Sequence, residues 1–299
     1  MQPNTQQRAS SRSREVNGAS ETVEVPARYA REITARERLL EQCPIDVYVA
    51  GVCDRYSWPW RLVAANEADR PGLRESCETL IVDSVYSDPY YPVGDVLEAA
   101  HAVDADYVVS KDYPDEPRTA LDAHGRFLSL WRRHKCDAEP IPVLSTHDLS
   151  SFRGQCRHYA RREDDVGTVA VGGLRDARGA VQVRYFREAR KVLGYDVDLH
   201  GLGVGTSTEL IGALQESIAD DSDRPLIDSF DISTPENAVR NNKLADKRWS
   251  QHRCPLPEGT DSTTVRAGFA EATARMLAYE LTTGCDESFS QDGTLTPDV

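Results

Sequence analysis

The sequence is poor in lysine. Only five of its 35 basic residues are lysines, and acidic residues outnumber basic ones by 49 to 35, which gives a formal net charge of −14. Concentrated salt screens the repulsion among so many carboxylates, with a Debye length of about 3 Å at 1 M. The composition therefore favours a halophilic source, although arginine-rich codon usage combined with ordinary acidity would give the same counts.

Long apolar runs, a signal-peptide core and Cys-x-x-Cys pairs are also missing. No run approaches the roughly 18 apolar residues that a membrane-spanning helix needs, and the N-terminus has no apolar core of the signal type. The seven cysteines are odd in number and widely spaced, which fits a reduced compartment. We expect a cytoplasmic protein without a membrane segment.

An acidic chain is a poor general binder of nucleic acid, because neutralisation of phosphates by Lys and Arg dominates that affinity. Any such contact is therefore expected to be local. Basic residues cluster at Arg132 to Lys135, at Arg153, Arg157, Arg161 and Arg162, and between Arg240 and Arg253. Solvated helix faces carry similar clusters, so these segments permit a nucleic-acid contact without indicating one.

Most of the chain is expected to form one α/β domain. Its 299 residues, 39% of them hydrophobic, can bury one sizeable core. Residues 1–24 have almost no apolar side chains and residues 285–299 are similar, so neither segment can offset the entropy lost on ordering. We predict a disordered N-terminal tail (1–24), one domain (25–284) and a flexible C-terminal tail (285–299).

Within the domain, short apolar runs alternate with longer amphipathic segments. The short runs are apolar on both faces, as in a buried parallel sheet, and the long segments have helical periodicity. This alternation predicts a (β/α)₈ TIM-like barrel, with an eighth strand within residues 246–262. The other predicted strands are residues 46–50, 79–83, 107–110, 141–144, 168–171, 198–202 and 226–228, and the helices are residues 94–103, 117–135, 149–162, 180–193 and 206–219.

Polar and glycine residues follow the predicted strands directly, and active sites of (β/α)₈ barrels collect at the carboxyl ends of the strands. A strand over residues 226–228 places Asp228 and Asp231 at this end, and Pro235 marks the segment that follows as a loop. We expect the two aspartates to lie together at the mouth of the barrel.

Five segments, in order, resemble the tRNA-guanine transglycosylase superfamily over residues 46–245. Asp83-Ser84 resembles the start of its Asp-Ser-Gly-Gly-Phe motif, Asp112 its base-reading aspartate, and Val171-Gly-Gly-Leu174 its Gly-Gly-Leu loop. His200-Gly-Leu-Gly-Val-Gly205 resembles its Leu-Met-Gly-Val-Gly segment. Asp228-Ser-Phe-Asp231, with Thr234-Pro235 and Ala238-Val-Arg240-Asn241, resembles its Asp-x-Phe-Asp, Pro-Thr-Arg and Ala-Arg-Asn signature.

The resemblance implies exchange of a base at a nucleoside C1′, and the residue types fit that chemistry. Such an exchange passes through an oxocarbenium-like state and needs a carboxylate nucleophile and a proton-transfer partner. We expect Asp231 to be the nucleophile and Asp83 the general acid/base. A capping role for Asp231 and an ordinary turn at Asp83-Ser84 are the alternatives.

Other residues are expected to bind the base. Asp112 would accept hydrogen bonds from a guanine-like edge, while Gly172 and Gly173 would admit a flat ring beside the Leu174 N–H. His147 stands where the family presents a base-reading Gln. A salt bridge from Asp112 to Lys111 or a nearby arginine, and a simple turn at the two glycines, remain open.

A third group of residues is expected to position the substrate: Asp228, Gly203, Gly205, Arg240 and Asn241. The two glycines would cradle a phosphate before the helix at 206–219, although Ser207 or Thr206 would also cap that helix. Arg240 and Asn241 would hold substrate phosphate, with a solvated loop as the alternative.

The sequence departs from the family at its usual zinc site. Of the Cys-x-Cys-x-x-Cys and His ligands only His252-x-Cys254 remains, which is too few for a tetrahedral site. Val85-Tyr86-Ser87 also replaces Gly-Gly-Phe after Asp83-Ser84. We therefore expect no metal. We also expect no organic cofactor, because a covalent intermediate would conserve the energy of the glycosidic bond.

A compact chain without zinc is most similar to the relatives that insert 7-deazaguanine derivatives into DNA, which implies a viral or archaeal origin. The resemblance implies a DNA substrate and a 7-deazaguanine base such as preQ0, with tRNA as the alternative polymer. Hydrolysis of a nucleoside or glycoside, and a catalytically silent barrel that binds nucleic acid, are the alternative functions. The sequence leaves homodimer formation open.

Overall fold

A computed structural model describes most residues between 40 and 282. The exceptions are residues 53–55, 89, 114–115, 135, 162–165, 220–223, 237–242, 246–250, 254–270, 272–273, 276 and 279–280. Both predicted tails, as well as Arg240 and Asn241, therefore lie outside the described residues. Within the described part of the chain, no helix combines the length and the apolar character needed to cross a membrane.

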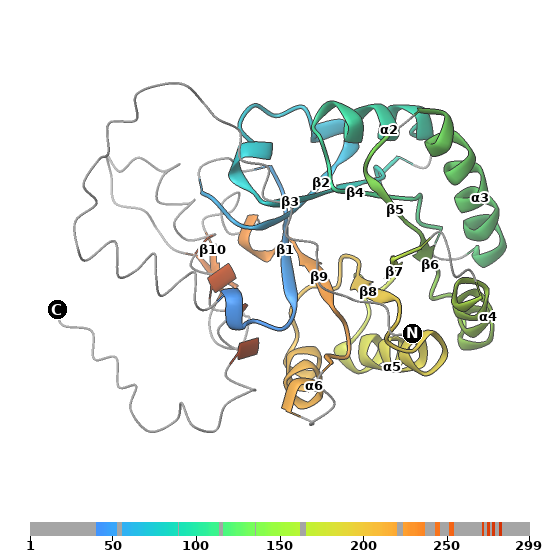
Figure 1. Cartoon of the computed structure of the whole chain (residues 1–299). Coiled ribbons are helices and arrows are strands. Elements are labelled where there is room, and N and C mark those ends of the chain that lie inside the picture. The colour runs from blue at the N-terminus through green and yellow to red at the C-terminus, as the bar shows by residue number, and fades with distance from the viewer. Residues whose placement is uncertain are drawn as a thin grey trace, which may run out of the picture.

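The described strands form a parallel barrel (Figure 1). Their order around it is β5-β4-β3-β2-β1-β9-β8-β7-β6. The strands are β1 (Asp46–Ala50), β2 (Trp60–Ala64), β3 (Thr79–Asp83), β4 (Tyr107–Val109), β5 (Glu139–Ile141), β6 (Val143–Leu144), β7 (Thr168–Val171), β8 (Asp198–Gly201) and β9 (Ser229–Ile232).

One chain segment closes the ring. Only Pro142 separates β5 from β6; β5 pairs with β4, and β6 pairs with β7. The Pro142 carbonyl accepts a hydrogen bond from the Ala170 N–H at 2.8 Å, so the segment passes from pairing with β4 to pairing with β7 at this residue. The nine strands therefore occupy eight positions around the barrel, which confirms the predicted (β/α)₈ TIM-like fold.

Helices connect the strands from β3 onwards and lie outside the ring (Figure 1). All five begin and end within two residues of their predicted limits. They are α2 (Val93–Ala102), α3 (Pro117–His134), α4 (Leu149–Ala160), α5 (Gly179–Leu193) and α6 (Thr208–Ala219).

Alternation along the strands separates an inner core from an outer one. Tyr48, Leu62, Ile81, Val109 and Ala170 pack together in the inner core. Their neighbours, such as Val47, Val49 and Phe230, pack outward against the helices. The outer core also contains the buried residues Ala274, Leu277, Ala278 and Leu281 from near the end of the described chain. The side chains that face the barrel axis are therefore set by the two-residue period of each strand.

The eighth strand was predicted in the wrong place. It is β2, between β1 and β3, whereas β11 (Gln251–Arg253) pairs with β10 (Lys243–Ala245) in a separate two-stranded sheet. Only the short 3-10 helices η1 (Ala65–Glu67) and η2 (Arg74–Ser76) join β2 to β3. The β2 region therefore lacks the long amphipathic segment that marks the other repeats.

A buried ion pair fixes β2 to the chain that follows β9. The Arg61 guanidinium lies 3.2 Å from Glu236 Oε1 and donates to the Tyr56 carbonyl at 2.9 Å. Tyr56 Oη donates to the same Glu236 oxygen at 3.0 Å. Gly51 makes room for Glu236, because a Cβ at residue 51 would lie 2.1 Å from Glu236 Cγ. The start of the loop after Asp231 is thereby held against the barrel wall.

Candidate active site

Three predicted carboxylates lie at the mouth of the barrel, the end at which the carboxyl ends of the strands meet. Asp83 is the last residue of β3, Asp231 lies one residue before the end of β9, and Asp112 follows β4. Burial raises the pKa of Asp83 well above its usual value, and the negative charges of Asp231 and Asp112 raise it further. The three side chains therefore share one electrostatic environment, which favours a proton on Asp83.

Lys111 supplies the nearby positive charge. Its ammonium donates hydrogen bonds to the Val85 carbonyl and, at 2.5 Å, to the Asp88 carbonyl, and its charge opposes the rise in the pKa of Asp83. These bonds hold the loop after β3, where Tyr86 is 57% exposed and Tyr90 is 91% exposed. Two aromatic rings are thus displayed to solvent within seven residues of Asp83.

Asp231 is buried and held through one of its carboxylate oxygens. The Gly203 N–H donates to Oδ1 at 2.6 Å, and His200 Nε2 lies 3.4 Å from the same atom. The described residues make no other hydrogen bond to the Asp231 side chain. Fixing one oxygen orients the carboxylate and leaves Oδ2 for a reaction partner.

His200 is fully buried and is itself held on two sides. Its Nδ1 lies 2.8 Å from Ser229 Oγ, and the Tyr48 ring meets the imidazole edge-on with the centroids 5.5 Å apart. In the sequence, His200 stands out only as the first residue of a glycine-rich segment. The alternation of residues along β8 places His200 on the face that points into the barrel, and this pattern could have identified it as a site residue.

Gly172 and Gly203 contact the carboxylates, though not in the way predicted. A Cβ at residue 172 would lie 2.5 Å from both Asp112 Oδ2 and Val143 Cγ1, so Gly172 provides the space that Asp112 occupies. Gly203 has a φ of 63°, which glycine adopts without strain, and it directs its N–H at Asp231. Both glycines therefore support a carboxylate.

The other predicted loop residues lie farther from these contacts. Gly173 is exposed, a Cβ built at Gly205 would meet open space, and the Leu174 side chain is buried in the outer core. Ser207 Oγ accepts a hydrogen bond from the Leu210 N–H at 3.2 Å, so the predicted capping of the following helix is confirmed. His147 is exposed in the loop between β6 and α4.

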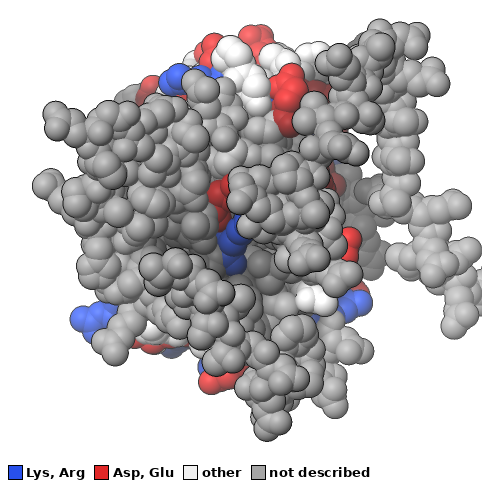
Figure 2. Space-filling view, turned by 90° about the vertical axis from the view of Figure 1, so that its left-hand side faces the viewer, with Lys and Arg blue, Asp and Glu red and all other residues white. Residues whose placement is uncertain are grey.

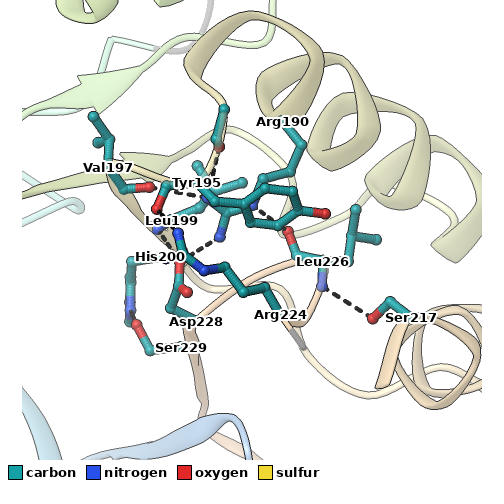
Figure 3. A network of polar contacts seen from close by, with 11 residues as sticks. Arg190, Tyr195, Val197, Leu199, His200, Ser217, Arg224, Leu226, Asp228 and Ser229 are labelled. Atoms are coloured by element: carbon teal, nitrogen blue, oxygen red, sulfur yellow. Dashed lines mark hydrogen bonds and ion pairs between the residues drawn. The ribbon is translucent and has the colours of Figure 1, made fainter. Parts of the chain in front are cut away.

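Asp228 does not belong to the mouth. Strand β9 starts at Ser229, so Asp228 precedes it and lies at the opposite, N-terminal end of the barrel. Its Oδ2 accepts a hydrogen bond from the Leu199 N–H at 2.6 Å and pairs with Arg190 (Figure 3). The expected carboxylate pair with Asp231 was therefore wrong, because the apolar residues Leu226 and Ile227 precede the strand instead of forming it.

Arg190 joins several segments at this lower end (Figure 3). Its guanidinium donates to the carbonyls of Leu226 at 2.9 Å, Val197 at 2.9 Å and Gly194 at 3.1 Å. The Tyr195 ring lies 4.8 Å from its central carbon. The contacts of Asp228 are thus structural ones that link α5 to the starts of β8 and β9.

No protein-family model and no curated protein matches this chain. Membership of a known family therefore stays a prediction from the five motifs.

A small polar cavity of about 70 Å³ lies inside the barrel below His200. Asp46, Asp198 and Asp228 line it together with Ser229 and His200. Burial, followed by the charges of Asp198 and Asp228, raises the pKa of Asp46 to about 6. Among the described residues, no group of three or more His, Cys, Asp or Glu side chains is arranged to hold a metal ion.

Proposed function

We propose that the protein is a base-exchange transglycosylase that replaces guanine in DNA with a 7-deazaguanine derivative such as preQ0. The observation that carries this proposal is the grouping of Asp83, Asp112 and Asp231 at the mouth, with one oxygen of Asp231 anchored and a proton favoured on Asp83. A carboxylate nucleophile beside a protonated carboxyl is the pair that glycosyl transfer with retention requires.

The first half of the reaction releases guanine. Asp231 Oδ2 attacks C1′ of the target nucleotide, an O–C1′ ester bond forms, and the C1′–N9 bond breaks with its electron pair going to N9. Protonated Asp83 gives its proton to the departing base and becomes a carboxylate. The raised pKa of Asp83 suits this step, because an ordinary aspartate would carry no proton near neutral pH.

The second half installs the new base. The Asp83 carboxylate removes the N9 proton of the incoming 7-deazaguanine, N9 attacks C1′, and the ester bond breaks to restore the Asp231 carboxylate. Asp83 is protonated again, so both aspartates finish in their starting states. The glycosidic bond energy is kept in the ester, and no organic cofactor is needed.

Base selection is assigned to Asp112 and the loop after β3. The Asp112 carboxylate accepts from the N–H and amino groups of a guanine-like edge, a pattern shared by guanine and its 7-deaza analogues. Tyr86 and Tyr90 offer exposed rings on which a base can stack. The choice of DNA comes from the family resemblance, and tRNA is the competing polymer.

The test is base exchange measured by nucleoside analysis. Purified protein is incubated with a guanine-containing duplex and preQ0, and the digested product is examined for the deazaguanine nucleoside by mass spectrometry. We expect incorporation by the wild type, none by Asp231→Asn, and wild-type incorporation by Glu98→Gln, an exposed control on α2.

Two other results would redirect the proposal. Release of guanine without any incoming base would identify a nucleoside hydrolase. Incorporation into a tRNA transcript alone would identify RNA as the polymer. Incorporation into DNA that survives Asp231→Asn would contradict the proposed nucleophile.

A further inference from the structure

Helices α3 and α4 carry a local excess of positive charge on an acidic protein. Together they contain six arginines and one acidic residue, Asp122, whereas the whole chain has a net charge of −14. Among the described residues along the upper edge in Figure 2, acidic side chains are more frequent than basic ones. The arginines of α3 and α4 thus give these two neighbouring helices a local positive charge on a chain that is acidic as a whole.

These two helices also enclose a groove. Two adjoining hollows of about 530 and 850 Å³ lie along them and share Leu121. Gly125 on α3 and Gly154 on α4 line the hollows, and apart from the neighbouring backbone of their own helices no atom lies within 4 Å of where their Cβ atoms would stand. The surface is thus hollowed where a bound chain can approach the backbone.

Three exposed arginines follow this groove along α3. Arg118 lines the first hollow, and Arg126 and Arg133 line the second together with His158 of α4. None of the three arginines has an ion-pair partner in the part of the chain that the structure describes. Glu116 and Asp122 are the acidic lining residues, and Glu116 accepts a hydrogen bond from Thr119 at 2.7 Å.

The spacing of the arginines suits a regular polyanion. They are eight and seven residues apart, or about 12 and 10 Å along the helix axis. Phosphates of one DNA strand repeat about every 3.4 Å along the duplex, so neighbouring arginines stand roughly three phosphates apart. A compact anion cannot reach all three, whereas a phosphodiester chain lying in the groove can.

The upper end of the groove lies beside the mouth. Helix α3 begins five residues after Asp112, and α4 begins two residues after His147. Figure 1 shows the two helices next to each other on the outside of the barrel. A strand leaving the mouth can therefore enter the groove directly.

We propose that the groove between α3 and α4 binds the phosphodiester backbone of the nucleic acid whose base is exchanged, an inference that rests on the proposed function for the identity of the polyanion. The three arginines neutralise phosphates that lie roughly three apart along the strand, and they hold the part of the strand that flanks the target base. The net charge of −14 on the whole chain opposes unspecific binding of phosphate outside this path.

Binding is tested separately from exchange. The affinity of a fluorescein-labelled DNA duplex is measured by anisotropy between about 0.05 and 0.2 M salt, for the wild type and for Arg118→Gln/Arg126→Gln/Arg133→Gln. The slope of log affinity against log salt is negative, and we expect its magnitude to decrease by about 3 in the triple variant. Arg184→Gln, which removes an exposed arginine from α5, is expected to leave the slope unchanged.

The outcomes distinguish the two proposals. If the triple variant has the wild-type melting temperature, salt slope and affinity, the proposed binding of DNA in the groove is refuted. It is also refuted if polyglutamate competes as well as DNA, because the groove would then be a site for acidic polypeptides. Binding that is lost in the triple variant but kept in Asp231→Asn supports the groove. If the wild type binds through the arginines yet exchanges no base, the groove stands and the proposed function fails.

Discussion

Replacing His200 by phenylalanine tests how the barrel holds Asp231, the proposed nucleophile. The phenyl ring keeps the planar shape against Tyr48 but loses the contacts to Ser229 Oγ at 2.8 Å and Asp231 Oδ1 at 3.4 Å. A hydrogen bond to a charged group contributes about 1.5–3 kcal/mol, and the 3.4 Å separation places this one at the lower end. The shorter bond from the Gly203 N–H remains.

A loss of about 1.5 kcal/mol corresponds to roughly a tenfold fall in kcat. KM should change little, because no substrate contact is removed. Steady-state base exchange provides the measurement, and His200→Gln, which keeps a side-chain donor, should recover part of the rate. His124→Phe is the matched control, since this second buried histidine lies on α3 beside Phe127 and Tyr159. If kcat is the same in His200→Phe and the wild type, the positioning role is refuted.

Three further variants probe the electrostatics and packing of the barrel. Asp83→Asn should lower kcat by about 100- to 10,000-fold. The raised pKa of Asp83 should make kcat depend on pH, and this dependence should disappear in the variant; a profile of kcat from acid to neutral pH measures it. Gly172→Ala places a Cβ 2.5 Å from Asp112 Oδ2. We expect the free energy of unfolding, measured by urea denaturation, to fall by about 1–3 kcal/mol, and base binding to weaken, which is measured as a higher KM. Asp46 has its pKa raised from 3.8 to about 6, so the folded state binds a proton that the unfolded chain releases, and this contribution to stability is lost as pH rises through that interval. Asp46→Asn should therefore stabilise the protein by up to about 3 kcal/mol at pH 8 and hardly at pH 4; equal effects at the two pH values would contradict the assignment.

The fold was predictable where hydrophobic periodicity is regular. Helices α2 to α6 each follow a buried strand and carry a long amphipathic pattern, so the alternation identified them. Strand β2 was not predicted from this pattern, because Arg61 interrupts its apolar run and only short 3-10 helices follow it. Arg61 can be buried there only because Glu236, far along the chain, neutralises it.

The part of the candidate site that lies at the carboxyl ends of the strands was predictable. Asp83, Asp112 and Asp231 come together because parallel strands place their carboxyl ends at one end of the barrel. Asp228 was misplaced, since a shift in the start of β9 moves a residue from one end of the strand to the other. The part played by His200 depends on partners 29 and 31 residues away, and no local pattern carries that information.

The most direct test of the central claim is a search for the covalent intermediate on Asp231. The protein is mixed with a guanine-containing DNA strand in the absence of an incoming base, quenched in acid, and analysed by intact mass and peptide mapping. The mechanism predicts a mass equal to protein plus DNA minus guanine, with the DNA attached to the peptide that contains Asp231 and no adduct in Asp231→Asn. Attachment at another residue, or exchange by the wild type without any adduct under conditions that trap an ester, would contradict it.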